Sequence, residues 1–252
     1  MIIHNAPQGS DEWFLARAGV ITASMFAECR KVVGGLNDQQ KIYVDAILSG
    51  RSEDSAKLLA GYKAAPKGAA VLAALAGEKV GDHSTAAKDY AFKLAIERIS
   101  KKSLDGGFQT GYMKRGNELE PFARMLHEAR IMQPVTEVGF VTTPCGRFGA
   151  TADGLINEDG GAEYKCFLAP EKVRAFWVDY DPSEVVDQVQ GGMWITGRKW
   201  WDVGMYCPDL EPVGKELWLQ RVYRDDNYIE QLESDLIDFE KLVSEYEVVL
   251  RS

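Results

Sequence analysis

The sequence has no long apolar segment, few cysteines and few histidines. No apolar run in its 252 residues approaches the roughly 20 residues of a membrane-spanning helix. The start, MIIHNAPQGS, lacks the basic and apolar regions of a secretory signal. Four scattered cysteines without a C-x-x-C pair and three distant histidines disfavour structural zinc, an iron–sulfur cluster or a histidine-rich metal site. We therefore expect a cytoplasmic protein with reduced thiols and no membrane association.

Basic residues are also in deficit, with 29 Lys and Arg against 38 Asp and Glu and a net charge of −9. At first sight this argues against a nucleic-acid partner, because Lys and Arg neutralise DNA phosphates. The deficit is local, however. Residues 225–247 carry nine acids and one base, whereas residues 1–224 hold 29 acids and 27 bases. We expect the acidic segment to form an outer solvated face, so the net charge does not exclude DNA.

Periodicity indicates a mixed α/β or α+β fold. Helical spacing and capping residues predict helices at 84–102, about 111–130, 183–196 and 225–250, with short helical pieces within 38–76. Alternating β-branched residues and turn signals predict strands at 135–143, 147–156, 162–168, 199–207 and 216–223. We expect one domain over 1–252, in which 30–110 is a helical insertion-rich segment and 225–250 an acidic C-terminal helix.

Three acids and a lysine lie where a metal site could form. Glu120 is on the helix before the sheet, Asp153 on the strand 147–156, and Glu163 and Lys165 on the next strand. Residues two apart on a strand share a face. Carboxylates and a backbone carbonyl suit Mg²⁺, and a lysine there could orient an attacking water, as metal-assisted phosphodiester hydrolysis requires. The spacing D-x9-E-x-K also arises by chance in an acid-rich chain, and solvated residues on an exposed strand remain the alternative.

Two further groups could assist this chemistry. Gln188, in the segment DQVQGGMW, could hydrogen-bond a water or a phosphate, although a surface glutamine would look the same. Arg17, Thr22 and Ser24 surround the start of a helix, where N–H groups, hydroxyls and a guanidinium make an anion site. Taken alone, these three residues are better explained by plain helix capping and a surface ion pair.

Five sequence blocks in one order resemble the phage lambda exonuclease family, also called the YqaJ-type viral recombinases, within the PD-(D/E)xK nuclease superfamily. They are QGSDEW with LARAGVITAS at 8–24, GNELE at 116–120, TADGL at 151–155, EYKC at 163–166, and QVQGGMWIT at 188–196. The resemblance does not extend to 30–110, and the C-terminal third is similar only in its strand-then-helix order. It implies a restriction-endonuclease-like core, with a central mixed β-sheet flanked by helices.

The resemblance implies a Mg²⁺-dependent 5′-to-3′ exonuclease, with Mn²⁺ as a possible substitute. It would degrade double-stranded DNA from a 5′-phosphorylated end to mononucleotides and leave 3′ overhangs for recombination by strand annealing. The family forms a ring-shaped homotrimer and works with a single-strand DNA annealing protein. The implied roles are metal ligation by Asp153, Glu163 and the Tyr164 carbonyl, a second metal held by Glu120 through water, water positioning by Lys165, support of the nucleophile by Gln188, and 5′-phosphate binding by Arg17, Ser24 and Thr151.

The chain departs from the family in two places. The family's S-P-D-G is T-A-D-G here, so Thr151 keeps a hydroxyl while the turn before Asp153 loses its proline. The segment 30–110 could also alter the interface of a ring. Two rival functions stay open at this point: a PD-(D/E)xK endonuclease of restriction or repair type, and a catalytically decayed DNA-binding protein.

Overall fold

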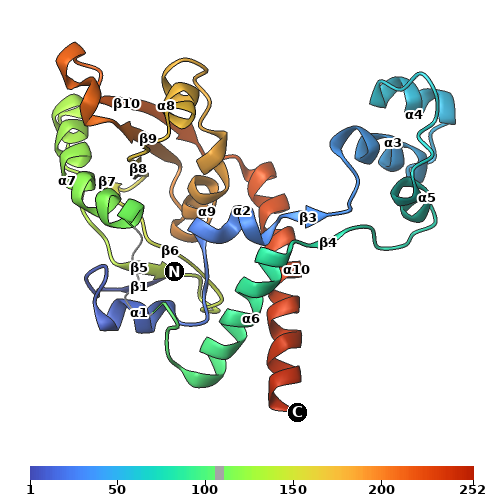
Figure 1. Ribbon diagram of the computed structural model, residues 1–252, viewed down its shortest axis with the longest axis horizontal. Helices are drawn as coiled ribbons and strands as arrows, with labels where there is room; N and C mark the ends of the chain where they lie inside the picture. Colours follow the sequence, from blue (N-terminus) through green and yellow to red (C-terminus); the bar gives the residue numbers. More distant parts are fainter. Residues whose placement is uncertain (106–110) are drawn as a thin grey trace. The chain divides into compact units, whose positions relative to one another are not determined.

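The structure is a computed structural model that describes residues 1–105 and 111–252 (Figure 1). The chain divides into two compact units, a larger one of Met1–Cys29 with Asp89–Ser252 and a smaller one of Arg30–Lys88. The sequence predicts a single domain whose helical segment ends near 110. The observed boundary lies earlier because helix α6 (Thr85–Ser100) continues into the larger unit, and residues 106–110 lie outside the described part. No helix within the described residues is both long and apolar enough to cross a membrane.

The smaller unit is mainly helical, as predicted for 38–76. It contains α3 (Asp38–Leu48), α4 (Glu53–Ala60) and α5 (Ala69–Leu75), with the short antiparallel strands β3 (Val32–Val33) and β4 (Asp82–His83). Buried Tyr43, Val44 and Val71 are among the residues of its own apolar core. Gly61 ends α4 with a φ of +73°, a left-handed conformation that glycine adopts at low cost.

The larger unit contains two four-stranded mixed sheets. The first has the order β1-β5-β6-β2 and the second the order β10-β9-β8-β7. Pairs β2–β6 and β8–β9 are parallel, and the other neighbours are antiparallel. The strands are β1 (Ile2–His4), β2 (Ile21–Thr22), β5 (Phe140–Thr142), β6 (Phe148–Ala150), β7 (Gly154–Ile156), β8 (Gly160–Lys165), β9 (Trp200–Tyr206) and β10 (Leu217–Tyr223).

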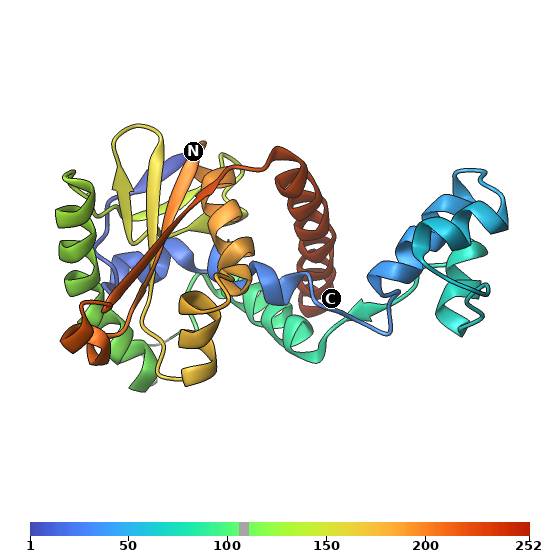
Figure 2. The same cartoon turned by 90° about the horizontal axis from the view of Figure 1, so that it is seen from above.

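Helices cover both faces of the second sheet. Helix α7 packs on one face of β8, β9 and β10, while α9 contacts β9 on the other face and also reaches β5 and β6 of the first sheet (Figure 2). The expected mixed α/β architecture is therefore confirmed. The helical segments are α1 (Asp11–Arg17), α2 (Phe26–Cys29), α7 (Gly111–Ile131), α8 (Pro170–Trp177), α9 (Val186–Thr196), α10 (Asp226–Arg251) and the 3₁₀ segments η1 (Ala23–Met25), η2 (Ser183–Val185) and η3 (Pro208–Val213).

The predicted single strand at 147–156 is wrong. Residues 148–150 pair with β5 and β2 in the first sheet, whereas residues 154–156 pair with β8 in the second. The chain crosses between the sheets at 151–153, so Asp153 lies in the crossing segment and not on a strand. Gly154 permits the close approach of a neighbouring segment, because a Cβ there would lie 2.1 Å from Val135 Cγ1.

The acidic helix α10 is not simply a solvated face. Its apolar stripe, which includes Leu232, Leu236 and Phe239, is buried. Glu240 and Glu247, however, are mostly covered and pair with Arg98, which is only 7% exposed. A buried guanidinium needs carboxylate partners, so these two acids face the protein and not the solvent.

Candidate active site

Three of the predicted site residues form a closed hydrogen-bonded triangle between β8 and α9. Lys165 Nζ donates to Glu163 Oε1 at 2.8 Å and to Gln188 Oε1 at 2.9 Å. Gln188 Nε2 in turn donates to Glu163 Oε1 at 2.6 Å. Glu163 is buried and is not a solvated residue of an exposed strand. The period-two alternation of β8 places Glu163 and Lys165 on the same face, and α9 presents Gln188 to that face.

Asp153 lies beside this triangle. Its Oδ2 accepts a hydrogen bond of 2.6 Å from the backbone N–H of Tyr164, the residue between Glu163 and Lys165. Burial raises the pKa of Asp153 well above its ordinary value, and the negative charges of Glu163 and Glu120 add to the effect. The structure therefore brings Asp153 next to Tyr164, the residue whose backbone carbonyl is the third expected metal ligand.

Glu120 approaches from α7. It pairs with Arg124 one turn later, and Arg124 also pairs with Glu137. Burial raises the pKa of Glu120 by more than the Arg124 charge lowers it. Glu120 and Asp153 line the same cavity of about 480 Å³, so the acid on the helix and the acid at the crossing face one space.

Lys165 is a charged donor in this arrangement. Burial alone would lower its pKa, but the negative charges of Glu163 and Asp153 outweigh burial and raise it. The ammonium group therefore remains protonated at neutral pH. It can donate a hydrogen bond to a water or to a phosphate oxygen, and it is unsuited to accept a proton.

A second, smaller cavity of about 150 Å³ adjoins the carboxylates, and we call it the Arg17 cavity. Its walls bring together residues from α1, η1, the crossing segment and α9, namely Gln8, Trp13, Arg17, Thr22, Ala23, Ser24, Thr151, Asp153 and Gln188. All three residues expected to bind phosphate are in this set. Asp153 and Gln188 are in it as well. They also belong to the set that we call the metal-site group, namely Glu120, Asp153, Glu163, Lys165 and Gln188.

Arg17 is held in this cavity by contacts other than carboxylates. Its Nη1 donates to Thr151 Oγ1 at 3.3 Å, and its guanidinium lies 4.2 Å from the centre of the Trp13 ring. Within the described residues, the buried Nε has no hydrogen-bond partner. Burial lowers the pKa of Arg17, although not enough to remove the charge of a guanidinium. The cavity thus contains a positive charge that forms no ion pair among the described residues, and an anion would complete it.

The Thr22 hydroxyl at the start of η1 contacts the hydroxyls of Ser24 and of Tyr90, the latter at 3.5 Å. Thr22 begins η1, but its side chain makes no capping hydrogen bond. Its Oγ1 lies 3.3 Å from Ser24 Oγ, and both residues line the Arg17 cavity. Capping as the sole role of Thr22 is therefore wrong. In α1, by contrast, Ser10 caps the helix and accepts a hydrogen bond from the Trp13 N–H at 3.2 Å.

The acids fit a divalent cation by charge and ligand type. Within the part of the chain that the structure describes, no group of three or more His, Cys, Asp or Glu residues is already arranged as a metal cage. Burial is the largest cause of the raised pKa of Asp153 and of Glu120, and the nearby Lys165 and Arg124 offset it only in part. Oxygen ligands around such charge suit Mg²⁺ or Mn²⁺, which usually retain several waters.

Some lining residues are not recognisable as functional from single motifs. Trp13 lies one helical turn before Arg17, a spacing that permits the stacking observed. Tyr90 lines the adjoining cavity of about 480 Å³ that also contains Arg17, and no sequence signal marks it. Gln190, two residues after Gln188, is buried and bonded to the backbone of Tyr223 and Asp225, so its role is structural.

Comparison with known proteins covers most of these residues. The family model of the YqaJ-like viral recombinase domain matches residues 12–199. An alkaline exonuclease from Laribacter hongkongensis, LHK-Exo, is 26% identical with a TM-score of 0.65, over 96% of this chain and 97% of that chain. The structure of LHK-Exo in complex with dAMP gives 25% identity and a TM-score of 0.66 over the same shares.

A third structure extends the likeness of fold alone. The phage related exonuclease from Haemophilus somnus 129PT is 14% identical with a TM-score of 0.53, over 92% of this chain and 95% of that chain. None of the curated protein sequences compared with the chain matches it significantly. The family model covers well over half of the chain and includes the residues of both cavities from Trp13 to Gln188. The protein belongs to the family of YqaJ-like viral recombinase domains.

Proposed function

We propose that the protein is a Mg²⁺-dependent exonuclease that degrades double-stranded DNA 5′ to 3′ from a 5′-phosphorylated end. It would release mononucleotides and leave 3′ overhangs for recombination by strand annealing, in the cytoplasm. One observation carries the proposal: Asp153 and Gln188 belong both to the metal-site group and to the cavity that contains Arg17. The similarity to exonucleases, one of them in complex with dAMP, supports it.

The metal-site residues have distinct tasks in this proposal. Asp153, Glu163 and the Tyr164 carbonyl would hold the cation, and Glu120 would hold a second one through water. Bound Mg²⁺ supplies Lewis-acid polarisation of the phosphate and a water of lowered pKa. Lys165, protonated and hydrogen-bonded to Gln188, would orient the attacking water. Gln188 would keep both Lys165 and Glu163 in position through its amide group.

The Arg17 cavity would bind the terminal 5′-phosphate. Arg17 supplies the positive charge, and the hydroxyls of Ser24 and Thr151 supply hydrogen bonds. Because Asp153 lines the same small cavity, the bound phosphate and the phosphate under attack would be neighbours along the strand. That arrangement favours release of one nucleotide at a time. Mn²⁺ would be expected to replace Mg²⁺ with the same oxygen ligands.

We also propose that the protein acts as a homotrimeric ring together with a single-strand DNA annealing protein. This assembly rests on the family resemblance. Light scattering of the purified protein would give the mass in solution, and a monomeric mass at working concentrations would contradict the ring.

The decisive experiment uses linear duplex DNA labelled at one 5′ end, with Mg²⁺ or with chelator. We expect a labelled mononucleotide as the first product with Mg²⁺ and no product with chelator. A covalently closed circle of the same sequence is the matched control and should survive. Cutting of the circle would favour an endonuclease, and chelator-resistant digestion would reject the metal site. Binding to DNA should weaken with added salt, as backbone contacts require.

A further inference from the structure

Two arginines behind the Arg17 cavity share one pair of carboxylates on helix α10. Arg98 donates to both oxygens of Glu240, at 2.6 and 2.8 Å, and to Glu247 at 3.1 Å. Arg147 Nη1 lies 3.3 Å from the same Glu240 oxygen and 3.7 Å from Glu247 Oε1. Two acids of the acidic segment therefore connect α6 to the start of β6, and the other acids of α10 do not share this role.

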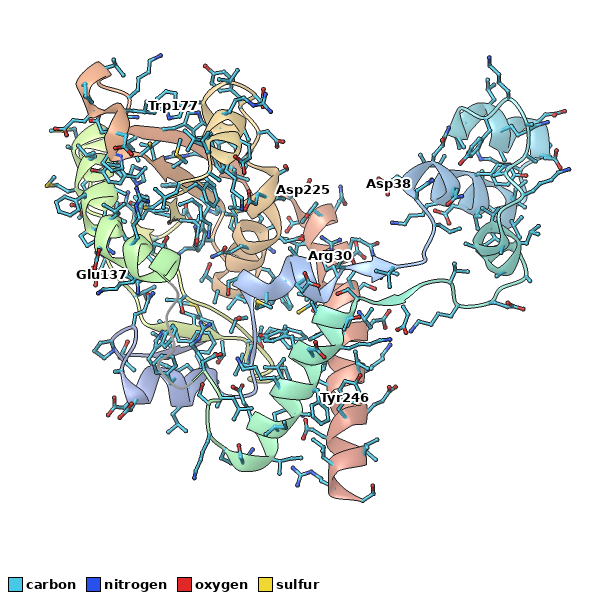
Figure 3. The ribbon with its side chains drawn as sticks, in the orientation of Figure 1. Arg30, Asp38, Glu137, Trp177, Asp225 and Tyr246 are labelled. Carbon is cyan, nitrogen blue, oxygen red and sulfur yellow. The ribbon has the colours of Figure 1, made fainter. Side chains whose placement is uncertain are left out.

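Helix α10 is packed where it can support these contacts. The Tyr246 ring, labelled in Figure 3, lies edge-on to Phe92 of α6 with 5.5 Å between ring centres. Earlier in α10, the Phe239 ring stacks on the Tyr90 ring with 6.0 Å between ring centres. Because both aromatic contacts flank Glu240, its carboxylate has a fixed position relative to Arg98.

Arg98 and its neighbour Glu97 fix the turn that carries Arg17. Arg98 Nε donates to the Gly19 carbonyl at 2.7 Å, and Glu97 Oε2 accepts from the Gly19 N–H at 2.8 Å. Gly19 has a φ of +74°, and a Cβ there would lie 2.4 Å from Arg98 Cγ. The side chains of Arg98 and Glu97 thus hold the backbone C=O and N–H of Gly19, which lies only two positions after Arg17. They fix one wall of the cavity.

Arg147 connects the segment after Arg17 to strand β6. Its carbonyl accepts from the Ile21 N–H at 2.9 Å and so continues the pairing of β2 with β6. Strand β6 leads directly to Thr151, whose hydroxyl accepts the hydrogen bond from Arg17. The same carboxylate pair therefore supports the segment before Thr151 and the segment after Arg17.

We infer that Glu240 and Glu247 are positioning residues for the Arg17 cavity and that they set its selectivity for 5′-phosphorylated ends. The inference rests on the proposed function, because it takes the terminal phosphate as the ligand of that cavity. It predicts an effect that a merely stabilising ion pair would not have. Weakening the contacts of Glu240 and Glu247 changes the ratio of the rates on phosphorylated and unphosphorylated ends. A loss of stability alone lowers the fraction of active protein and therefore lowers both rates equally.

The test compares Glu240→Gln with Glu245→Gln, which removes the same charge from the same helix. Glu245 is exposed and forms no ion pair within the described residues. Rates on matched duplexes with 5′-phosphate or 5′-hydroxyl ends are measured where circular dichroism shows both variants folded. We expect the kcat/KM ratio between the two ends to fall about tenfold in Glu240→Gln, mainly through KM, and to be unchanged in Glu245→Gln.

A milder variant keeps the test valid if Glu240→Gln does not fold. Arg147 is 45% exposed, and Arg147→Gln should lower the same ratio by a smaller factor. A native-like ratio in the folded variants, or an equal fall in rate on both ends, overturns the inference alone. A parent protein that treats both ends equally overturns the proposed phosphate cavity and the inference with it.

Discussion

Buried ionisable side chains lie on both faces of the sheet at strand β8, and the two faces differ in how far opposite charges compensate them. On the face toward α7, His127 Nδ1 lies 2.8 Å from the Tyr164 hydroxyl, and its Nε2 lies 3.2 Å from Asp202 Oδ2. Arg221 completes this group with hydrogen bonds of 2.8 and 2.9 Å to Asp202. On the face toward α9, Glu163 is paired with Lys165, while the nearby Asp153 accepts a hydrogen bond from the Tyr164 N–H.

The pKa shifts separate the two faces. Burial alone would raise the pKa of Asp202, but hydrogen bonds from Arg221 and His127 hold it below its ordinary value. Burial and two neighbouring carboxylates raise the pKa of Asp153 instead. At Asp202 the opposite charges outweigh burial, whereas at Asp153 they do not, and we call the face toward α9 the uncompensated face for that reason. A carboxyl perturbed in this way beside a lysine is a candidate for a functional site.

The largest effect is expected on the uncompensated face. Glu163→Ala should lose Mg²⁺-dependent hydrolysis of linear DNA by at least about 10⁴-fold, equivalent to ~5.5 kcal/mol, because a metal ligand is removed. The protein should remain folded by circular dichroism. Glu158→Gln in the exposed β7–β8 turn is the control and should keep parent activity. Digestion at the parent rate by Glu163→Ala would reject the assigned site.

The paired face should respond in stability and not in chemistry. Asp202→Asn leaves Arg221 and His127 without their carboxylate, and we expect the free energy of unfolding to fall by about 3–5 kcal/mol. Urea unfolding measures this change, and Asp209→Asn on the surface should shift it by less than about 0.5 kcal/mol. The folded fraction should retain its rate per molecule. A selective loss of rate with unchanged stability would mean that the two faces do not differ as described.

Arg17 offers a smaller effect. Arg17→Lys keeps the charge but loses the forked donor geometry and the stacking on Trp13. We expect the preference for 5′-phosphorylated over 5′-hydroxyl ends to fall about tenfold, or ~1.4 kcal/mol. Kinetics on the two matched duplexes would show this, with Arg174→Lys, an exposed arginine of α8, as control. Equal losses on both ends would contradict a phosphate-binding role.

Local patterns predict the part of the site that lies within single elements. The two-residue period of β8 places Glu163 beside Lys165, and the predicted helix at 183–196 contains Gln188. Asp153 is different, because alternation over 147–156 gives no sign that the chain changes sheets there. Its proximity to β8 depends on pairing between distant segments, which period alone does not encode.

Sequence spacing does not predict contacts between residues that lie far apart in the chain. Arg17 and Thr151 are 134 residues apart, and the common role proposed for them rests on the family resemblance and not on any spacing pattern. The acids of α10 look alike in sequence, yet Glu240 meets an arginine 142 residues away while Glu245 is exposed. The choice between solvated and buried acid is made by tertiary packing around Arg98, so the predicted solvated face was wrong at those positions.

The smallest effect tests the cost of the uncompensated charge. The raised pKa of Asp153 means that, between about pH 4 and that raised pKa, the folded state binds more protons than the unfolded state. Stability of the metal-free protein must therefore fall as pH rises through this window. Asp153→Asn removes that penalty and should raise stability in chelator at neutral pH by ~1 kcal/mol, or about 2–4 °C in Tm, with no gain near pH 4. Mg²⁺ should raise the Tm of the parent protein but not of the variant. A gain that is the same at both pH values would show that burial of the side chain, and not its charge, distinguishes the two faces of β8.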